Sequence, residues 1–165
     1  MQKRTAKTLL LSLAAPIPIL LCSAFLQAQQ LTIQTEDGKQ TVLQRADIEA
    51  LPHTKAPGRG AVPVTYEGVL LRAVLEKAGV DLDQGLRGKR MALCLLVEAA
   101  DGYRAVIALP EISPAFDNKQ IVLAFMRDGK PLDDKEGPYR VIVPEDKMMA
   151  RWVRQVTTLK IVPVQ

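Results

Sequence analysis

The sequence predicts an α+β fold in which a β-rich mixed sheet domain carries one main amphipathic helix. Three observations predict this class. Short segments that are apolar or alternate between apolar and polar residues recur along the chain, as in strands. Asp-Gly pairs at 101–102 and 128–129 are typical of tight turns between strands. Only residues 71–78 repeat apolar side chains at helical spacing. About seven strands and one convincing helix are therefore expected.

Residues 1–28 have the three parts of a secretory signal peptide. Three basic residues and no acid stand within the first seven positions, an apolar stretch covers 9–26, and the small residue Ala28 follows. Pro16 and Pro18 interrupt the apolar stretch, so it is poorly suited to a permanent membrane anchor. We expect cleavage after Ala28 and a periplasmic or secreted protein.

Two alternatives remain open for this segment. Leu26 is bulky for the third position before the cut, so cleavage after Ala24 is the alternative site. Cys22 raises the possibility of lipidation, but Leu21 stands where a lipobox needs a small side chain.

The remaining residues, 29–165, are expected to form a single domain. Residues 1–28 contain three of the 22 Lys and Arg residues and none of the 18 acids, so the remainder has a net charge of about +1. This balance does not indicate a nucleic-acid partner, which requires a clustered basic face. One cysteine, Cys94, remains, so no internal disulfide can form.

The first half of the domain is predicted to open with a hairpin. Its strands are 31–35 and 41–43, joined by the turn sequence Glu36-Asp37-Gly38-Lys39. A short helical turn is expected next, at 45–51, followed by an exposed loop rich in Pro, Gly and cations at 53–60. A strand is then expected at 61–66, and Gly68 closes it.

The main helix is predicted from Leu71 to Ala78. Leu71, Val74, Leu75 and Ala78 follow the i, i+3, i+4, i+7 pattern of an amphipathic helix packed on a sheet, and Gly79 ends it.

The second half of the domain is predicted to be mainly strands. The unbroken apolar run 91–97 is typical of a strand buried on both faces. Further strands are expected at 103–109, 121–126, 139–143 and 156–162, with a short helix or turn at 110–116 and a helical turn at 144–150.

Three motifs in order carry a family resemblance. They are Tyr66-Glu67-Gly68-Val69-Leu70-Leu71 with its helix stop; Asp101-Gly102-Tyr103 with Leu109-Pro110; and the run Val122-Leu123-Ala124-Phe125, Asp128-Gly129-Lys130-Pro131-Leu132, Gly137-Pro138-Tyr139-Arg140 and Arg151-Trp152-Val153. Together they resemble the oxidoreductase molybdopterin-binding domain of the sulfite oxidase family, as a small stand-alone protein. The resemblance covers about residues 60–163.

The resemblance implies a domain that, in full-length relatives, holds molybdenum through the dithiolene of a pterin and one cysteine thiolate, a soft donor suited to this metal. In the family that cysteine precedes the aromatic-x-Gly-Val motif. Residues 53–65 contain no cysteine here, and Cys94 lies in an apolar strand, as a small buried hydrophobe would. We therefore expect no metal ligand, no catalytic residue and no cofactor, with molybdopterin only if the chain is an enzyme.

Four residues are candidates for a binding cleft. Arg140 and Arg151 match positions that are basic in the family, and each guanidinium could grip a phosphate or a carboxylate. The alternative is a pair of solvated surface arginines, paired with Glu136 or Asp146. Tyr103 and Trp152 are expected at the cleft, as amphipathic aromatics often are, although Trp152 is equally consistent with the core.

Other patterns indicate chemistry less specifically. His53 is the sole histidine and has no apparent relay or zinc partners. Asp133, Asp134 and Glu136 could take a calcium ion but lack EF-hand spacing and suit a solvated turn. Met148 and Met149 suggest either an adaptable apolar contact surface or a cap of the core.

Two functions follow. The first is an exported, noncatalytic binding module for a small anionic ligand or a periplasmic protein partner. The alternative is a molybdopterin-dependent oxidoreductase of the sulfite oxidase type, which rests on fold alone.

Overall fold

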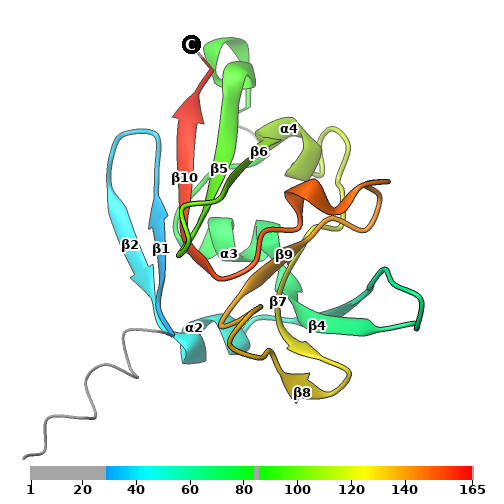
Figure 1. Cartoon of the computed structure of the whole chain (residues 1–165). Coiled ribbons are helices and arrows are strands. Elements are labelled where there is room, and N and C mark those ends of the chain that lie inside the picture. The colour runs from blue at the N-terminus through cyan, green and yellow to red at the C-terminus, as the bar shows by residue number, and fades with distance from the viewer. Residues whose placement is uncertain (1–28, 84–85, 165) are drawn as a thin grey trace, which may run out of the picture.

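The computed structural model describes residues 29–83 and 86–164, and the expected signal peptide lies outside them. Within these residues ten strands form two five-stranded sheets (Figure 1). The first sheet contains β1 (Leu31–Gln34), β2 (Gln40–Leu43), β5 (Leu93–Ala99), β6 (Arg104–Ala108) and β10 (Val156–Pro163). The second contains β3 (His53–Pro57), β4 (Thr65–Leu70), β7 (Val122–Arg127), β8 (Lys130–Pro131) and β9 (Arg140–Ile142). The helical segments are α2 (Arg45–Glu49), α3 (Leu71–Lys77), α4 (Leu109–Ile112) and the 3₁₀ turns Gly88–Ala92 (η1) and Met149–Arg151 (η2). The predicted β-rich α+β class is confirmed.

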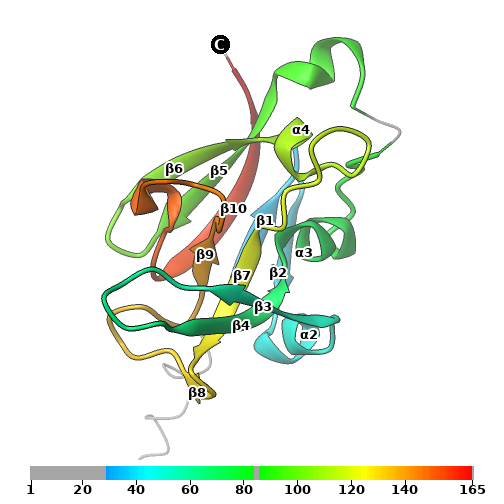
Figure 2. The same ribbon diagram turned by 90° about the vertical axis from the view of Figure 1, so that its right-hand side faces the viewer.

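The first sheet joins the two ends of the domain. Its order is β2-β1-β10-β5-β6, with β10 parallel to β1 and antiparallel to β5. The closing strand therefore lies inside the sheet, and β6 forms one edge (Figure 2). Gly102 has a φ of +84° in the β5–β6 turn, which confirms the predicted Asp-Gly hairpin.

In the second sheet the role predicted for Gly68 was wrong. The expected strand does not end at Gly68 but runs through it to Leu70. A Cβ at Gly68 would lie 2.1 Å from the carbonyl oxygen of Leu123 on β7. Glycine is needed there because two backbones approach closely, a role that its sequence position alone does not distinguish from a strand end.

The loop predicted at 53–60 was also wrong in its first half. Residues 53–57 form β3, antiparallel to β4, and Pro57 lies at the strand end on the sheet edge. Only Ala56 is buried in this strand, so the sequence does not show the alternation of apolar and polar residues that predicts a strand. The strand expected from residue 61 begins at Thr65, and the helical turn expected at 144–150 is reduced to η2.

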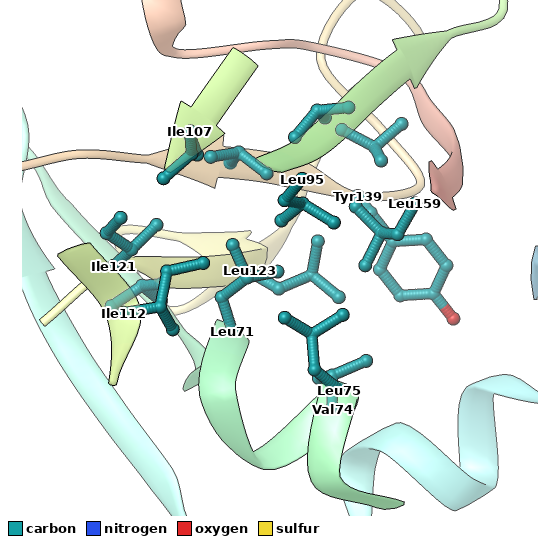
Figure 3. Packing of buried hydrophobic residues seen from close by; sticks show 14 of the residues in the cluster. Leu71, Val74, Leu75, Leu95, Ile107, Ile112, Ile121, Leu123, Tyr139 and Leu159 are labelled. Atoms are coloured by element: carbon teal, nitrogen blue, oxygen red, sulfur yellow. The ribbon is translucent and has the colours of Figure 1, made fainter. Parts of the chain in front are cut away.

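The predicted main helix is confirmed as α3, which packs into the core (Figure 3). Leu71, Val74 and Leu75 are fully buried, and Figure 3 shows them facing side chains of both sheets, among them Leu95 and Leu123. Among the described residues no helix is long and apolar enough to cross a membrane.

Candidate functional site

A buried arginine stands at the centre of the candidate site. Arg140 on β9 is 9% exposed. Its Nη1 donates to the hydroxyl of Tyr66 at 2.7 Å and to Oε1 of Glu136 at 2.5 Å. Arg127 also contacts Glu136, at 3.2 Å. One carboxylate thus lies between two guanidinium groups, which balances part of their charge.

Aromatic rings hold the Arg140 guanidinium in place. Its Cζ lies 5.2 Å from the ring centroid of Tyr66 and 5.9 Å from that of Trp152, within cation–π range. The two rings meet edge to face at 6.3 Å. Trp152 is 4% exposed, and its indole Nε1 donates to the carbonyl of Val143. Burial raises the pKa of the Tyr66 phenol, so this hydroxyl stays protonated and can donate to Glu136.

A cavity of about 200 Å³ opens beside this arginine. It lies between the β5–β6 turn and the η2 segment, and Tyr103 bridges these segments by donating to the carbonyl of Ala150 at 2.7 Å. Its lining residues are Asp101, Tyr103, Arg140, Met149, Ala150, Trp152, Val153 and Arg154. The structure therefore brings Tyr103, Arg140 and Trp152 together around one cavity.

Arg151 points to a different set of partners. Its Nε and Nη2 donate to the two carboxylate oxygens of Asp146, at 2.8 and 2.6 Å, and its Nη1 lies 3.1 Å from Glu111. Glu111 in turn pairs with Lys119 at 2.7 Å. Arg151 does not line the cavity. Arg151 thus makes the ion pair with Asp146 that was the alternative expectation for it. Arg140, by contrast, is buried and is not a solvated surface arginine.

The pKa values of the two acids that pair with Arg151, Asp146 and Glu111, are both lowered. Hydrogen bonding from Arg151 lowers the pKa of Asp146 and outweighs its burial. Burial would raise the pKa of Glu111, but hydrogen bonds from Lys119 and the Ala108 N–H, with the charge of Arg151, lower it overall. Both acids are therefore ionised at neutral pH.

The hydrogen bonds of Arg140 leave one edge of its guanidinium free. In the described part of the chain, Nη1 makes every hydrogen bond of this group, and Nε is buried without a partner. A guanidinium binds carboxylates and oxyanions through two parallel N–H donors, and Nε with Nη2 forms such a pair. A buried donor without a partner is costly and calls for an explanation.

The family membership follows from comparison with known proteins. Residues 39–165 match the model of the oxidoreductase molybdopterin binding domain. The chain belongs to this family. Among solved structures it is similar to the sulfane dehydrogenase SoxCD from Paracoccus pantotrophus, with a TM-score of 0.63 and 21% sequence identity, over 82% of this chain and 39% of that one. At this identity the likeness shows the fold alone, and the chain spans about two fifths of the SoxCD chain. No curated protein matches the chain.

The donor set of this molybdopterin-binding-type domain does not fit a thiolate-held molybdenum. Cys94 is 6% exposed on β5, and its Sγ donates to the carbonyl of Val162 on β10 at 3.5 Å. Burial raises the pKa of the Cys94 thiol, which disfavours the thiolate that would bind a metal. Cys94 does not line the cavity beside Arg140.

The cavity itself is also a poor match for a pterin cofactor. About 200 Å³ is below the roughly 300–1,000 Å³ typical of sites for drug-sized ligands. Arg140, the residue that would contact a phosphate of the cofactor, is already paired with the carboxylate of Glu136, whose negative charge disfavours an anionic ligand. Among residues 29–83 and 86–164, no three His, Cys, Asp or Glu side chains are grouped to hold a metal ion.

The remaining sequence candidates have structural partners elsewhere. His53 lies on β3 and contacts Glu67 at 3.3 Å and the Glu49 carbonyl at 3.0 Å. Asp133 accepts the backbone N–H groups of Lys135 and Glu136, as a turn-forming aspartate does.

Sequence reasoning missed two parts of the site. Tyr66 was noticed only as the aromatic residue of a fold motif, yet it stacks on Arg140 from a position 74 residues away. Arg154 was not singled out, because nothing in the sequence shows that it lines the same cavity. The acid at Glu136 was noticed, and the structure shows that it pairs with both Arg140 and Arg127.

Proposed function

We propose that this protein is an exported, noncatalytic binding module that keeps the molybdopterin-type fold and binds a small anionic ligand in the cavity beside Arg140. The ligand replaces the missing partner of the guanidinium. Tyr103 and Trp152 form the walls beside it, and Arg151 acts only as a structural residue. A periplasmic protein that presents an anionic group is the second kind of partner consistent with this site.

One observation supports this proposal above the others: Arg140 is buried, lines a cavity and has an Nε donor without a hydrogen-bond partner among the described residues. An uncompensated buried donor costs roughly 1–3 kcal/mol, and a bound anion would recover that free energy. The alternative, a molybdopterin-dependent oxidoreductase, lacks an accessible thiolate among the described residues.

Export is supported by the features of residues 1–28, which combine three basic residues, an apolar stretch and the small residue Ala28. The hydroxyl of Tyr139 donates to the carbonyl of Gln29 at 2.9 Å, which ties the residue after the expected cleavage site to the domain. Intact mass measurement of the protein from a periplasmic extract tests this point. A mass that corresponds to a chain starting at Gln29 is expected, and a full-length chain in the cytoplasm would contradict export.

The enzyme reading is tested by the metal content. The full chain is purified from cells that make the molybdenum cofactor, and molybdenum is measured by mass spectrometry together with the fluorescence of oxidised pterin. We expect neither in stoichiometric amount. Near-stoichiometric molybdenum with pterin would overturn the noncatalytic proposal.

Ligand binding is tested in parallel by calorimetric titration with benzoate, acetate and sulfate. Saturable binding of at least one anion is expected for the wild type. If none binds, the anion-binding part of the proposal fails.

A further inference from the structure

Resting on the proposed anion-binding function, we propose that the ligand of the cavity beside Arg140 is a zwitterion of the size of a free α-amino acid, with one carboxylate and one ammonium group. Arg154 and Arg140 receive the carboxylate, and Asp101 receives the ammonium group. The new element is the acid in the cavity lining, which the binding of a simple anion leaves without a role.

The charges around the cavity balance before a ligand binds. Arg140 and Arg154 line it together with one acid, Asp101. Glu136 pairs with Nη1 of Arg140 and supplies the second negative charge. Arg127 also contacts Glu136, but it lines a separate cavity and contacts a further acid there. A bound anion or cation therefore disturbs this balance, whereas a zwitterion adds no net charge.

Asp101 and Arg154 are opposite charges that line one cavity and have no ion-pair partner in the described part of the chain. Both residues are exposed. Asp101 uses Oδ1 to accept the Tyr103 N–H at 2.9 Å, which leaves its second carboxylate oxygen for a ligand. The guanidinium of Arg154 makes no hydrogen bond within residues 29–83 and 86–164. A ligand with an ammonium group and a carboxylate supplies a partner to each.

The backbone holds these two charges on facing segments. The N–H of Ala100, next to Asp101, donates to the carbonyl of Gln155, next to Arg154, at 2.9 Å. The N–H of Gln155 donates in turn to the carbonyl of Glu136 at 2.9 Å. Gln155 has a φ of +50°, which is uncommon for a residue other than glycine. The acid and the base are therefore placed at one cavity before a ligand arrives, which lowers the cost of binding.

Arg140 adds a further donor for the carboxylate. Its Nη1 is used by Tyr66 and Glu136, and its Nε is buried. Its Nη2 also has no partner among the described residues but, unlike Nε, is not buried. Nη2 is thus the donor of this guanidinium that a ligand in the cavity can reach.

The volume of the cavity suits a molecule of this size. A water molecule takes up about 30 Å³ of the liquid, so about 200 Å³ corresponds to roughly seven waters. A free α-amino acid with an apolar side chain of small or medium length is of this size. Met149 and Tyr103 line the cavity and are about half exposed, so they can contact that side chain.

Three ligands with the same carbon skeleton test the charge requirement by calorimetric titration of the wild-type protein. L-leucine is a zwitterion, isocaproate lacks the ammonium group, and L-leucinamide lacks the carboxylate. An exposed ion pair contributes up to about 1 kcal/mol, so we expect L-leucine to bind about fivefold more tightly than either of the others. Equal or tighter binding of isocaproate or L-leucinamide would overturn the zwitterion inference and leave anion binding in place. Absence of binding by L-leucine, isocaproate and benzoate alike would overturn the proposed function itself.

Variants then test which residue meets which charge. Asp101→Asn keeps an acceptor for the Tyr103 N–H and should reduce the preference for L-leucine over isocaproate to within about twofold. Arg154→Gln should weaken both of these ligands by about fivefold and leave L-leucinamide unchanged. Asp134→Asn is the matched control, because Asp134 is exposed and lies outside the cavity lining, and it should change no affinity.

A preference for L-leucine that persists in a folded Asp101→Asn protein would show that this acid does not receive the ammonium group, and it would overturn the inference. The comparison of the three ligands on the wild type decides the same point if a variant does not fold.

Discussion

Arg140 and Arg151 both pair with carboxylates, but they differ in how many of their donors are used. Arg151 donates from Nε, Nη1 and Nη2 to Asp146 and Glu111. Among the described residues Arg140 donates only from Nη1, although it is the more buried of the two, with a side-chain exposure of 11% against 27%. A guanidinium with its donors in use stabilises the fold. We propose a ligand for the guanidinium of Arg140 because it is buried and its Nε has no partner among the described residues.

The largest expected effect is on ligand binding at Arg140. Arg140→Met keeps a long side chain beneath Tyr66 and Trp152 but removes the donors. We expect the affinity for benzoate to fall about 100-fold, as when one partner of a buried charge pair is removed. Calorimetry measures the affinity, and circular dichroism checks the fold. Retained affinity in a folded variant would show that the free edge is not the binding site.

The matching change at Arg151 should affect stability instead. Arg151→Met leaves Asp146 and Glu111 without their shared cation and should lower the free energy of unfolding by ~2–3 kcal/mol. Urea denaturation measures this loss. Benzoate affinity should stay within about twofold of the wild type. A loss of affinity as large as that of Arg140→Met would remove the distinction between the two arginines.

The sequence could select three residues that line one cavity, but it could not distinguish the two arginines. The order of three motifs predicted the fold, and it placed Tyr103, Arg140 and Trp152 among four candidates, three of which share a cavity. Arg151 could not be separated from Arg140, because each has an acid four or five residues away, and the further partner of Arg151, Glu111, is 40 residues away in the sequence. Donor saturation depends on such long-range pairs, which composition and spacing do not encode.

The errors in the predicted fold have the same cause, namely contacts between residues that are far apart in the sequence. β3 was expected to be a loop because four of its five residues do not look buried, and its strand conformation depends on pairing with β4. Gly68 resembles a strand terminator until Leu123 is seen against it. By contrast, α3 was predictable, because its apolar spacing is a local property.

The stability of the protein in acid should depend on the two carboxylates that pair with Arg151. The pKa values of Asp146 and Glu111 are lower in the folded protein than their ordinary values. The stabilisation from these acids is therefore complete above about pH 5 and is lost as the pH falls through the lowered values. Urea denaturation at several pH values between about 3 and 7, a range that brackets the ordinary carboxyl pKa of about 4, should show this loss in the wild type. Arg151→Met should show a weaker pH dependence, and an equal dependence would place the acid-sensitive groups elsewhere.

The smallest effect is expected at the cysteine. Cys94→Ala removes a buried sulfur whose only hydrogen bond is weak, and it should cost ~1 kcal/mol of unfolding free energy. Benzoate affinity should not change, because Cys94 lies outside the cavity lining. A change in ligand affinity or in metal content would show that this thiol has a role at the site.

The most direct test of the account is the ¹⁵N–¹H resonance of each arginine Nε during titration with benzoate. The Nε of Arg140 has no hydrogen-bond partner in the described protein, whereas that of Arg151 is bound to Asp146. We predict a saturable shift of the Arg140 signal with the Arg151 signal unchanged. An unmoved Arg140 signal at saturating benzoate, or equal shifts of both, would contradict the assignment of the free guanidinium edge as the anion site.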